Sequence, residues 1–256
     1  MTWDPTQYLK FGQPRLRPGL ELIARVPDIE PALVFDLGCG TGALTAELQA
    51  RWPAARVVGV DASPEMLARA AADHPSIDWV QTDVGSWYPE QAPSIVFSNA
   101  TLHWLDRHDE LFPRLLGYLA PGGYLAVQMP GNFEAPTHRL MFAAAHEGPW
   151  RAKLAPLMRE RPVLAPDDYY GTLAPLAAAV DIWETTYLHV LSGQDPVLEW
   201  IRGSALRPLL KALTVEEQRA FEALYATKLR DAYSERADGT TLLSFRRLFI
   251  LAHARG

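Results

Sequence analysis

The sequence predicts one α/β domain, a doubly wound and mostly parallel sheet of seven strands that carries a helical cap. Three observations indicate this fold class. Short apolar runs alternate with helical segments up to residue 130, a glycine-rich turn follows the first of these runs, and two β-rich stretches return late in the chain. Apolar strands that alternate with helices are typical of a parallel sheet covered on both faces.

The first half of the chain contains five candidate strands, each a run of apolar and β-branched residues. They are expected at 32–37, 56–60, 77–80, 94–98 and 124–129. Helical segments are expected at 43–52, 65–73 and 107–119. Pro53 must end or kink the first of these helices. Ser63 and Pro64 open the second as cap and first-turn proline, and Pro121 with two glycines stops the third.

The second half is organised differently. Residues 131–240 hold many prolines among helix-like pieces and one returning β-rich stretch at 180–190, so we expect a mainly helical cap. Helices are expected at 195–203, 205–212 and 215–233. Residues 241–256 supply the last strand, at the edge of the same sheet. Residues 1–256 are therefore predicted to form a single domain with 25–130 as its core.

Composition excludes several classes of protein. The 256 residues are 48% hydrophobic and 21% charged, which suits a folded domain rather than a disordered chain. The net charge of −6 disfavours nucleic acid and anionic membrane surfaces as partners. A single cysteine, Cys39, permits neither an internal disulfide nor a cysteine-based zinc site, and we expect no metal. With no signal-like leader and no long apolar run, the expected location is the cytoplasm.

The strongest local motif is the turn Asp36-Leu37-Gly38-Cys39-Gly40-Thr41-Gly42 between a strand and a helix. Glycines let the backbone turn sharply and approach a ligand closely. Asp61 ends the second strand, where a carboxylate can accept from ribose hydroxyls, although it could also serve only as a helix cap. The core is therefore expected to bind an adenosine-type cofactor. The glycine spacing also fits a dinucleotide, but Asp36 would repel a pyrophosphate and favour a cation such as the ammonium of S-adenosylmethionine.

Residues 32–130 resemble the class I S-adenosylmethionine-dependent methyltransferases through DLGCGTG, VVGVD and TDVGSW. The resemblance implies a Rossmann-like fold, contacts from the loop glycines to the methionine moiety and from Asp61 to the ribose. It also implies that Asp83 binds the adenine amino group beside the Val84 amide, with Ala62 or Met66 on the adenine face. The expected cofactor-binding residues are Asp36, Gly38, Gly40, Asp61, Ala62, Met66, Asp83, Val84 and Asn99.

Further segments resemble one family of that class, the enzymes that methylate trans-aconitate. These segments are MTWDPTQYLKF, SNATLHWL, AVQMPGN, HEGPW, IRGSALRP and SFRRLFILA, and they span nearly the whole chain. The resemblance implies transfer of a methyl group to one carboxylate, giving a monomethyl ester and S-adenosylhomocysteine. Because a carboxylate is already ionised at neutral pH, no general base is needed, and we expect no catalytic residue beyond positioning by His103 and Trp104.

A site for a tricarboxylate beside a sulfonium needs arginines, whose planar guanidinium pairs bidentately with carboxylates. The expected substrate-binding residues are Tyr8, Arg17, His103, Trp104, Gln128, Arg207 and Arg246, with Arg15 as a further candidate in the N-terminal segment. Alternation along the last strand sends Arg246 and Arg247 to opposite faces, so at most one of them faces the site. The competing interpretation is that each arginine is a surface group, His103 a satisfied helix-start residue and Trp104 part of the core.

Two other functions remain open from the sequence. One is methylation of another small acceptor, such as an acyl-carrier-bound carboxylate or a quinone precursor. The other is an adenosylmethionine-binding module without catalysis. The expected partner is a small anionic polycarboxylate, with no nucleic acid and no membrane, and the sequence predicts no oligomeric state.

Overall fold

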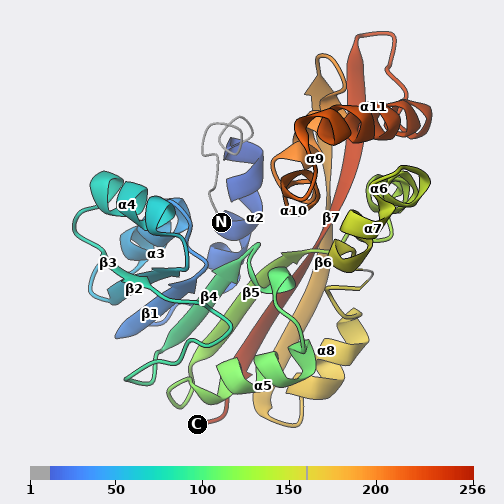
Figure 1. Cartoon of the computed structure of the whole chain (residues 1–256). Coiled ribbons are helices and arrows are strands. Elements are labelled where there is room, and N and C mark those ends of the chain that lie inside the picture. Colours follow the sequence, from blue (N-terminus) through green and yellow to red (C-terminus); the bar gives the residue numbers. More distant parts are fainter. Residues whose placement is uncertain (1–11, 160) are drawn as a thin grey trace.

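A computed structural model describes residues 12–159 and 161–256. Its centre is a seven-stranded sheet in the order β3-β2-β1-β4-β5-β7-β6 (Figure 1). The strands are β1 Leu33–Leu37, β2 Arg56–Asp61, β3 Asp78–Gln81, β4 Ile95–Asn99, β5 Tyr124–Pro130, β6 Ala177–Ser192 and β7 Thr240–Ala254. The first five are parallel, whereas β7 runs antiparallel to both β5 and β6. The predicted fold class is confirmed.

The helices follow the sequence signals closely. They are α2 Gly12–Arg25, α3 Ala43–Arg51, α4 Pro64–Asp73, α5 His108–Gly117, α6 Pro136–Glu147, α7 Arg151–Leu154, α8 Pro166–Leu173, α9 Pro196–Arg202, α10 Arg207–Lys211 and α11 Val215–Ala232, with short 3₁₀ turns η1 Leu102–Trp104 and η2 Ala155–Leu157. Ser63 caps α4 by accepting from the Met66 amide at 3.2 Å. Sequence reasoning did not anticipate α2, because Pro18 lies inside it.

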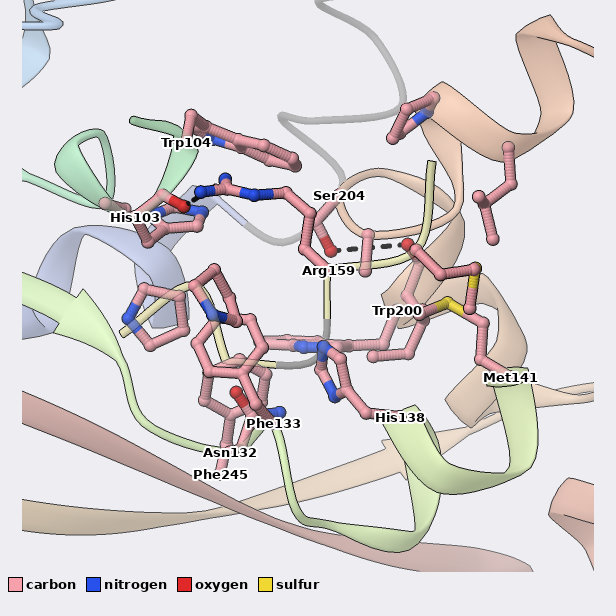
Figure 2. A pocket seen from close by; sticks show the side chains of 18 of the residues that line it. His103, Trp104, Asn132, Phe133, His138, Met141, Arg159, Trp200, Ser204 and Phe245 are labelled. Carbon is pink, nitrogen blue, oxygen red and sulfur yellow. Dashed lines mark hydrogen bonds between the residues drawn. The ribbon is translucent and has the colours of Figure 1, made fainter. Parts of the chain in front are cut away.

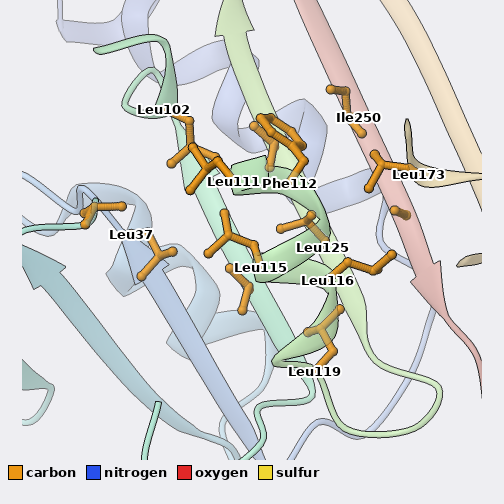
Figure 3. Packing of buried hydrophobic residues seen from close by; sticks show 14 of the residues in the cluster. Leu37, Leu102, Leu111, Phe112, Leu115, Leu116, Leu119, Leu125, Leu173 and Ile250 are labelled. Atoms are coloured by element: carbon orange, nitrogen blue, oxygen red, sulfur yellow. The ribbon is translucent and has the colours of Figure 1, made fainter. Parts of the chain in front are cut away.

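Helices cover both faces of the sheet, as the apolar strands require. On one face, α5 and α8 pack against alternate residues of the strands, including Leu125 and Ile250 (Figure 3). On the other face, α2 and α3 pack with Phe97 and Phe249. Successive residues of β4 thus enter opposite clusters, and this two-sided burial explains why the first three residues of the strand are all apolar.

The outer strands β6 and β7 extend beyond the rest of the sheet (Figure 1). Their protruding ends join α6, α9, α10 and α11 in a separate apolar cluster that includes Leu191 and Phe245. The buried rings of Trp150, Phe221 and Tyr225 lie in the same cluster. The cap is therefore attached to the core through continuous strands, and it stands at the carboxyl end of the parallel strands.

Candidate active site

The glycine-rich turn after β1 adopts a backbone conformation that residues other than glycine rarely adopt. Gly38, Gly40 and Gly42 all have positive φ angles, of 78°, 57° and 81°. A Cβ at Gly38 would lie 2.0 Å from Thr101 Oγ1, whereas a Cβ at Gly40 would have no described atom within 4 Å. Gly38 is thus required by packing, and Gly40 leaves open space in front of the loop. This open space is a cradle suited to the methionine part of a cofactor.

Asp61 ties this loop to the start of α4. One carboxylate oxygen accepts from the Gly40 amide at 2.9 Å and the other from the Ser63 amide at 2.8 Å. These bonds are compatible with a ribose-binding role for Asp61, because a carboxylate has about four acceptor positions and the bonds use two of them. The remaining lone pairs are available to ribose hydroxyls. The side-chain cap of α4 is Ser63.

Asp36 lies directly beneath the loop and is 2% exposed. Burial raises the pKa of this carboxyl to about 7, the Thr45 hydroxyl opposes the rise with a hydrogen bond of 2.7 Å, and nearby Asp61 adds to it. A cation bound at the loop would stabilise the ionised form of this carboxyl. The electrostatics of Asp36 thus favour an ammonium ligand over a pyrophosphate.

The residues expected around the adenine differ in exposure. Asp83 and Ala62 are exposed, and the Asp83 carboxylate accepts from the Gly85 amide at 2.7 Å. Met66 and Val84 are buried, 5% and 6% exposed, so much of each side chain serves packing.

A half-buried amide, that of Asn99, and a fully buried amide, that of Gln128, lie near the ends of β4 and β5. Asn99 and Gln128 are paired in the register of these strands. The Asn99 Oδ1 atom and both polar atoms of the Gln128 side chain have no hydrogen-bond partner among the described residues. Ala100, the next residue, has a φ of 54° although it is not glycine. Unpaired buried amides and backbone strain at one strand edge are typical of a site that binds a ligand.

A cavity of about 150 Å³ opens between this edge and the cap (Figure 2). Its polar lining comes from α2, η1, the segments after β5 and η2, α6, the loop after α9, and β7. These residues are Arg15, His103, Asn132, His138, Arg159, Ser204 and Arg247. Ala100 and Trp104 also line it, so the cavity adjoins the glycine loop through the segment after β4.

The structure brings only some of the expected substrate residues to this cavity. His103 and Trp104 line it, and Gln128 lies buried at the adjacent strand edge. Arg207, at the start of α10, is not among its lining residues, although its neighbours Pro208 and Leu209 are. Tyr8 lies outside the described residues.

Arg17 and Arg246 lie outside the lining of the cavity. The Arg17 side chain is 66% exposed and pairs with Glu21 at 2.7 Å on the surface of α2. The Arg246 side chain is 45% exposed, donates to the Gly131 carbonyl and pairs with Glu184.

Two other arginines, one on α2 and one on β7, line the cavity instead. Arg15 and Arg247 are 8% and 6% exposed and both line the cavity. The alternation of side chains along β7 and the helical period of α2 explain why Arg15 and Arg247, rather than Arg17 and Arg246, line the cavity. On β7, Arg247 lies on the same face as buried Phe249, so Arg246 must point the other way.

His103 is 8% exposed at the end of the cavity nearest the loop. Burial, together with the nearby guanidiniums of Arg247 and Arg159, lowers its pKa to about 3. The imidazole is therefore neutral and too weakly basic to accept a proton in catalysis. Its Nδ1 atom has no hydrogen-bond partner among the described residues, so the ring is free to contact a ligand.

Sequence reasoning missed Asn132, His138 and Arg159. Asn132 is 4% exposed, and both polar atoms of its amide lack a partner among the described residues. A polar residue just past the end of β5 was the available signal for it. His138 and Arg159 come from the cap, where no motif identifies the inward-facing residues.

No helix in residues 12–159 and 161–256 is long and apolar enough to span a membrane, and these residues contain no cluster of potential metal ligands. The single cysteine, Cys39, is half-buried in the loop, and burial raises the pKa of its thiol, which makes it an unreactive packing residue.

Comparison with known proteins agrees with this geometry. Residues 34–123 match the family described as "Methyltransferase domain". Among solved structures, the YcgJ protein of Bacillus subtilis has a TM-score of 0.58 at 14% identity, over 94% of this chain and 99% of that one. A Haemonchus contortus phosphoethanolamine N-methyltransferase bound to S-adenosylhomocysteine has a TM-score of 0.55 at 16% identity, and this chain spans 53% of its length. The fold and the loop thus define a class I S-adenosylmethionine-dependent methyltransferase.

Curated relatives narrow the class. The trans-aconitate 2-methyltransferase of Methylobacterium nodulans is 49% identical over 98% of this chain and 97% of its own length. The enzymes of the same name from Streptomyces avermitilis and Azoarcus sp. are 45% and 46% identical, each over 98% of this chain. The chain belongs to the trans-aconitate 2-methyltransferase family.

Proposed function

We propose that this protein transfers the methyl group of S-adenosylmethionine to one carboxylate of trans-aconitate, releasing the monomethyl ester and S-adenosylhomocysteine. The observation that carries the proposal is the burial of two arginines, Arg15 and Arg247, in the wall of the cavity that adjoins the glycine loop. Arginine buried in this way binds carboxylates well, because its planar fork matches their two oxygens.

The residues present fit the cofactor. The space before Gly40, the buried carboxyl of Asp36 and the open lone pairs of Asp61 suit a methionine ammonium and a ribose. The bound cofactor supplies an electrophilic methyl group on a sulfonium. We propose the cofactor-binding set Asp36, Gly38, Gly40, Asp61, Ala62, Met66, Asp83, Val84 and Asn99.

The protein's own part in the reaction is alignment and desolvation. Thr101 donates to the Gly38 carbonyl at 3.2 Å, which holds the segment after β4 against the cofactor loop. His103 and Trp104, two and three residues further on, face the cavity where the acceptor binds. Holding a carboxylate oxygen about 3–3.5 Å from the methyl carbon replaces a bimolecular encounter by an oriented one. With its pKa near 3, His103 contacts the acceptor as a neutral group.

The arginines of the cavity explain how an acidic protein can bind an anionic substrate. A protein of net charge −6 does not attract a trianion through its overall field. Arg15 and Arg247 instead bring positive charge into the cavity. Arg159, whose charge is paired with Asp106, and the buried amide of Asn132 add hydrogen-bonding capacity. We propose these residues, with His103, Trp104 and Gln128, as the acceptor site.

The test is methyl transfer from radiolabelled S-adenosylmethionine to trans-aconitate by purified protein. The matched variants are Arg247→Ala, which alters the face of β7 that lines the cavity, and Arg246→Ala, which alters the opposite face. We expect the first to raise KM for trans-aconitate at least tenfold and the second to leave it within about twofold, since loss of one hydrogen-bonded charge costs about 1.5–3 kcal/mol. Cofactor binding without methyl transfer to trans-aconitate would overturn the proposed substrate.

Two further points stand as proposals. Because β6 and β7 run through both the sheet and the cap cluster, we propose that the core and the cap form one domain. Location in the cytoplasm stays a prediction from the sequence.

A further inference from the structure

The cavity has two unlike ends. One end, toward the strand edge, carries the buried polar groups of His103, Asn132 and Arg247. The other end is formed by the cap and is apolar, and we name it the cap wall. The cap wall consists of Met141, Phe142, Met158, Ile201, Pro208 and Leu209. In Figure 2, Met141 lies on the side of the pocket away from His103 and Trp104.

The cap wall offers no hydrogen-bond donor to an anion. Its side chains are hydrocarbon, aromatic or thioether, and the polar neighbour Ser204 directs its hydroxyl to the Ile201 carbonyl at 3.3 Å. Met141, Ile201 and Leu209 are each less than 7% exposed and belong to the apolar cluster of the cap. The wall is therefore a continuation of a packed core rather than a solvated surface.

A carboxylate placed against this wall would lose its hydration without replacement, which is strongly unfavourable. The three carboxylates of trans-aconitate are therefore expected toward the polar end, where Arg247 and Asn132 lie. Arg15 is held against the end of α9, where it donates to the Trp200 carbonyl at 3.1 Å. The space along the cap wall suits hydrocarbon, because burying it removes apolar surface of both ligand and protein from water.

We infer that the same cavity accepts a second class of substrate, dicarboxylates that carry an alkyl chain, such as 2-alkylsuccinates. This inference rests on the proposed methyl transfer. One carboxylate of the acceptor is held at the polar end, the chain lies along the cap wall, and an oxygen of the other carboxylate forms the new bond to the methyl carbon. The bond from that carbon to sulfur breaks with its electron pair remaining on sulfur, so a methyl ester and neutral S-adenosylhomocysteine are formed without an external base.

The test is a series of 2-alkylsuccinates with chains from methyl to hexyl, assayed with labelled S-adenosylmethionine beside trans-aconitate. We expect kcat/KM to rise about three- to fourfold for each of the first few methylenes, the ratio that burial of one methylene supplies. The rise ends when the chain outgrows the cavity.

The variant Met158→Gln tests the wall itself. Met158 is half-buried in a loop, so the change is tolerated by the fold, and glutamine has a similar length. We expect the loss of kcat/KM for the hexyl acceptor to exceed the loss for trans-aconitate at least fivefold, since one buried polar amide offsets more than one buried methylene. Met158→Leu, which keeps the wall apolar, should retain the chain-length dependence.

The outcomes separate this inference from the proposed function. A kcat/KM that is independent of chain length or falls with it, while trans-aconitate is methylated, overturns the second substrate class alone. Equal losses for both acceptors in Met158→Gln also overturn it. No methylation of any acid by protein that binds S-adenosylmethionine overturns the proposed function instead.

Discussion

Arg159 donates from Nη1 to the backbone carbonyl of His103 at 2.7 Å. Its Nη2 atom donates to the Leu105 carbonyl at 2.8 Å and to the Asp106 carboxylate at 2.6 Å. A residue of the cap thereby satisfies the carbonyls at the end of η1, the turn that carries His103 and Trp104. The position of the acceptor-contacting turn thus depends on where the cap lies.

Loss of this contact should therefore affect turnover. In Arg159→Gln we expect kcat for trans-aconitate to fall at least tenfold, because η1 loses two carbonyl partners, while the dissociation constant for S-adenosylmethionine stays within about twofold. Steady-state kinetics and calorimetry measure the two quantities. Asp106→Ala is the matched control: it removes only the ion pair of a carboxylate whose side chain is 84% exposed, and it should change kcat little. Equal effects of both variants would contradict the role of the carbonyl contacts.

The binding of S-adenosylmethionine should depend on pH through Asp36. The pKa of this carboxyl is about 7, and the cofactor ammonium favours its ionised form. Affinity should therefore weaken as the pH falls from 7.5 to 5.5, by up to about tenfold per unit below 7, and binding should release protons near pH 7. Titration calorimetry in buffers of different ionisation enthalpy measures both effects. Asp36→Asn should bind more weakly at pH 7.5 and lose most of the pH dependence. A wild-type affinity that is flat over this range would exclude the coupling.

Two glycines of the loop should respond differently to alanine. Gly38→Ala places a Cβ 2.0 Å from Thr101 Oγ1, so it should lower the free energy of unfolding by more than about 2 kcal/mol. Gly40→Ala meets open space and bears only the cost of a positive φ, about 1 kcal/mol. It should remain folded and still lose affinity for S-adenosylmethionine at least fivefold. Urea unfolding and calorimetry distinguish the two, and unchanged affinity in Gly40→Ala would argue against the cradle.

A buried polar chain supports η1 from behind. Tyr169 donates to His108 Nδ1 at 2.5 Å, and His108 Nε2 donates to the Leu102 carbonyl at 2.9 Å. Tyr169→Phe leaves the buried Nδ1 atom without its donor, which should cost about 1–3 kcal/mol in the free energy of unfolding. Tyr170→Phe, at a neighbouring residue that is 56% exposed, should cost less than about 0.5 kcal/mol. Denaturant titration decides the matter, and similar values for both variants would count against the buried chain.

The sheet and the cofactor loop could be predicted because their causes are local. A strand buried on both faces must be apolar throughout, a turn at positive φ must contain glycine, and Pro53, Ser63 and Pro64 mark helix ends by their own stereochemistry. Helix α2 was missed because local propensity at Pro18 opposes it, whereas burial of Leu22 and Val26 against the sheet supports it.

For the acceptor site, the sequence predicted the kind of residue required but not which residues supply it. The sequence indicates that arginines must face a carboxylate substrate, and that Arg246 and Arg247 cannot both do so. Which of each neighbouring pair is buried depends on the face that packs against the rest of the protein. That face is set by α2 lying across the sheet and by the register of β7 against β5.

The class of fold, the cofactor loop and the family could be predicted from the sequence, since short contiguous segments encode the motifs that identify each of them. The placement of Arg15, Arg159 and Arg247 in one cavity and the apolar wall of the cap follow only from the folded chain. These residues come from segments far apart in the chain, and their side chains meet because the long strands β6 and β7 carry the cap over the carboxyl end of the sheet.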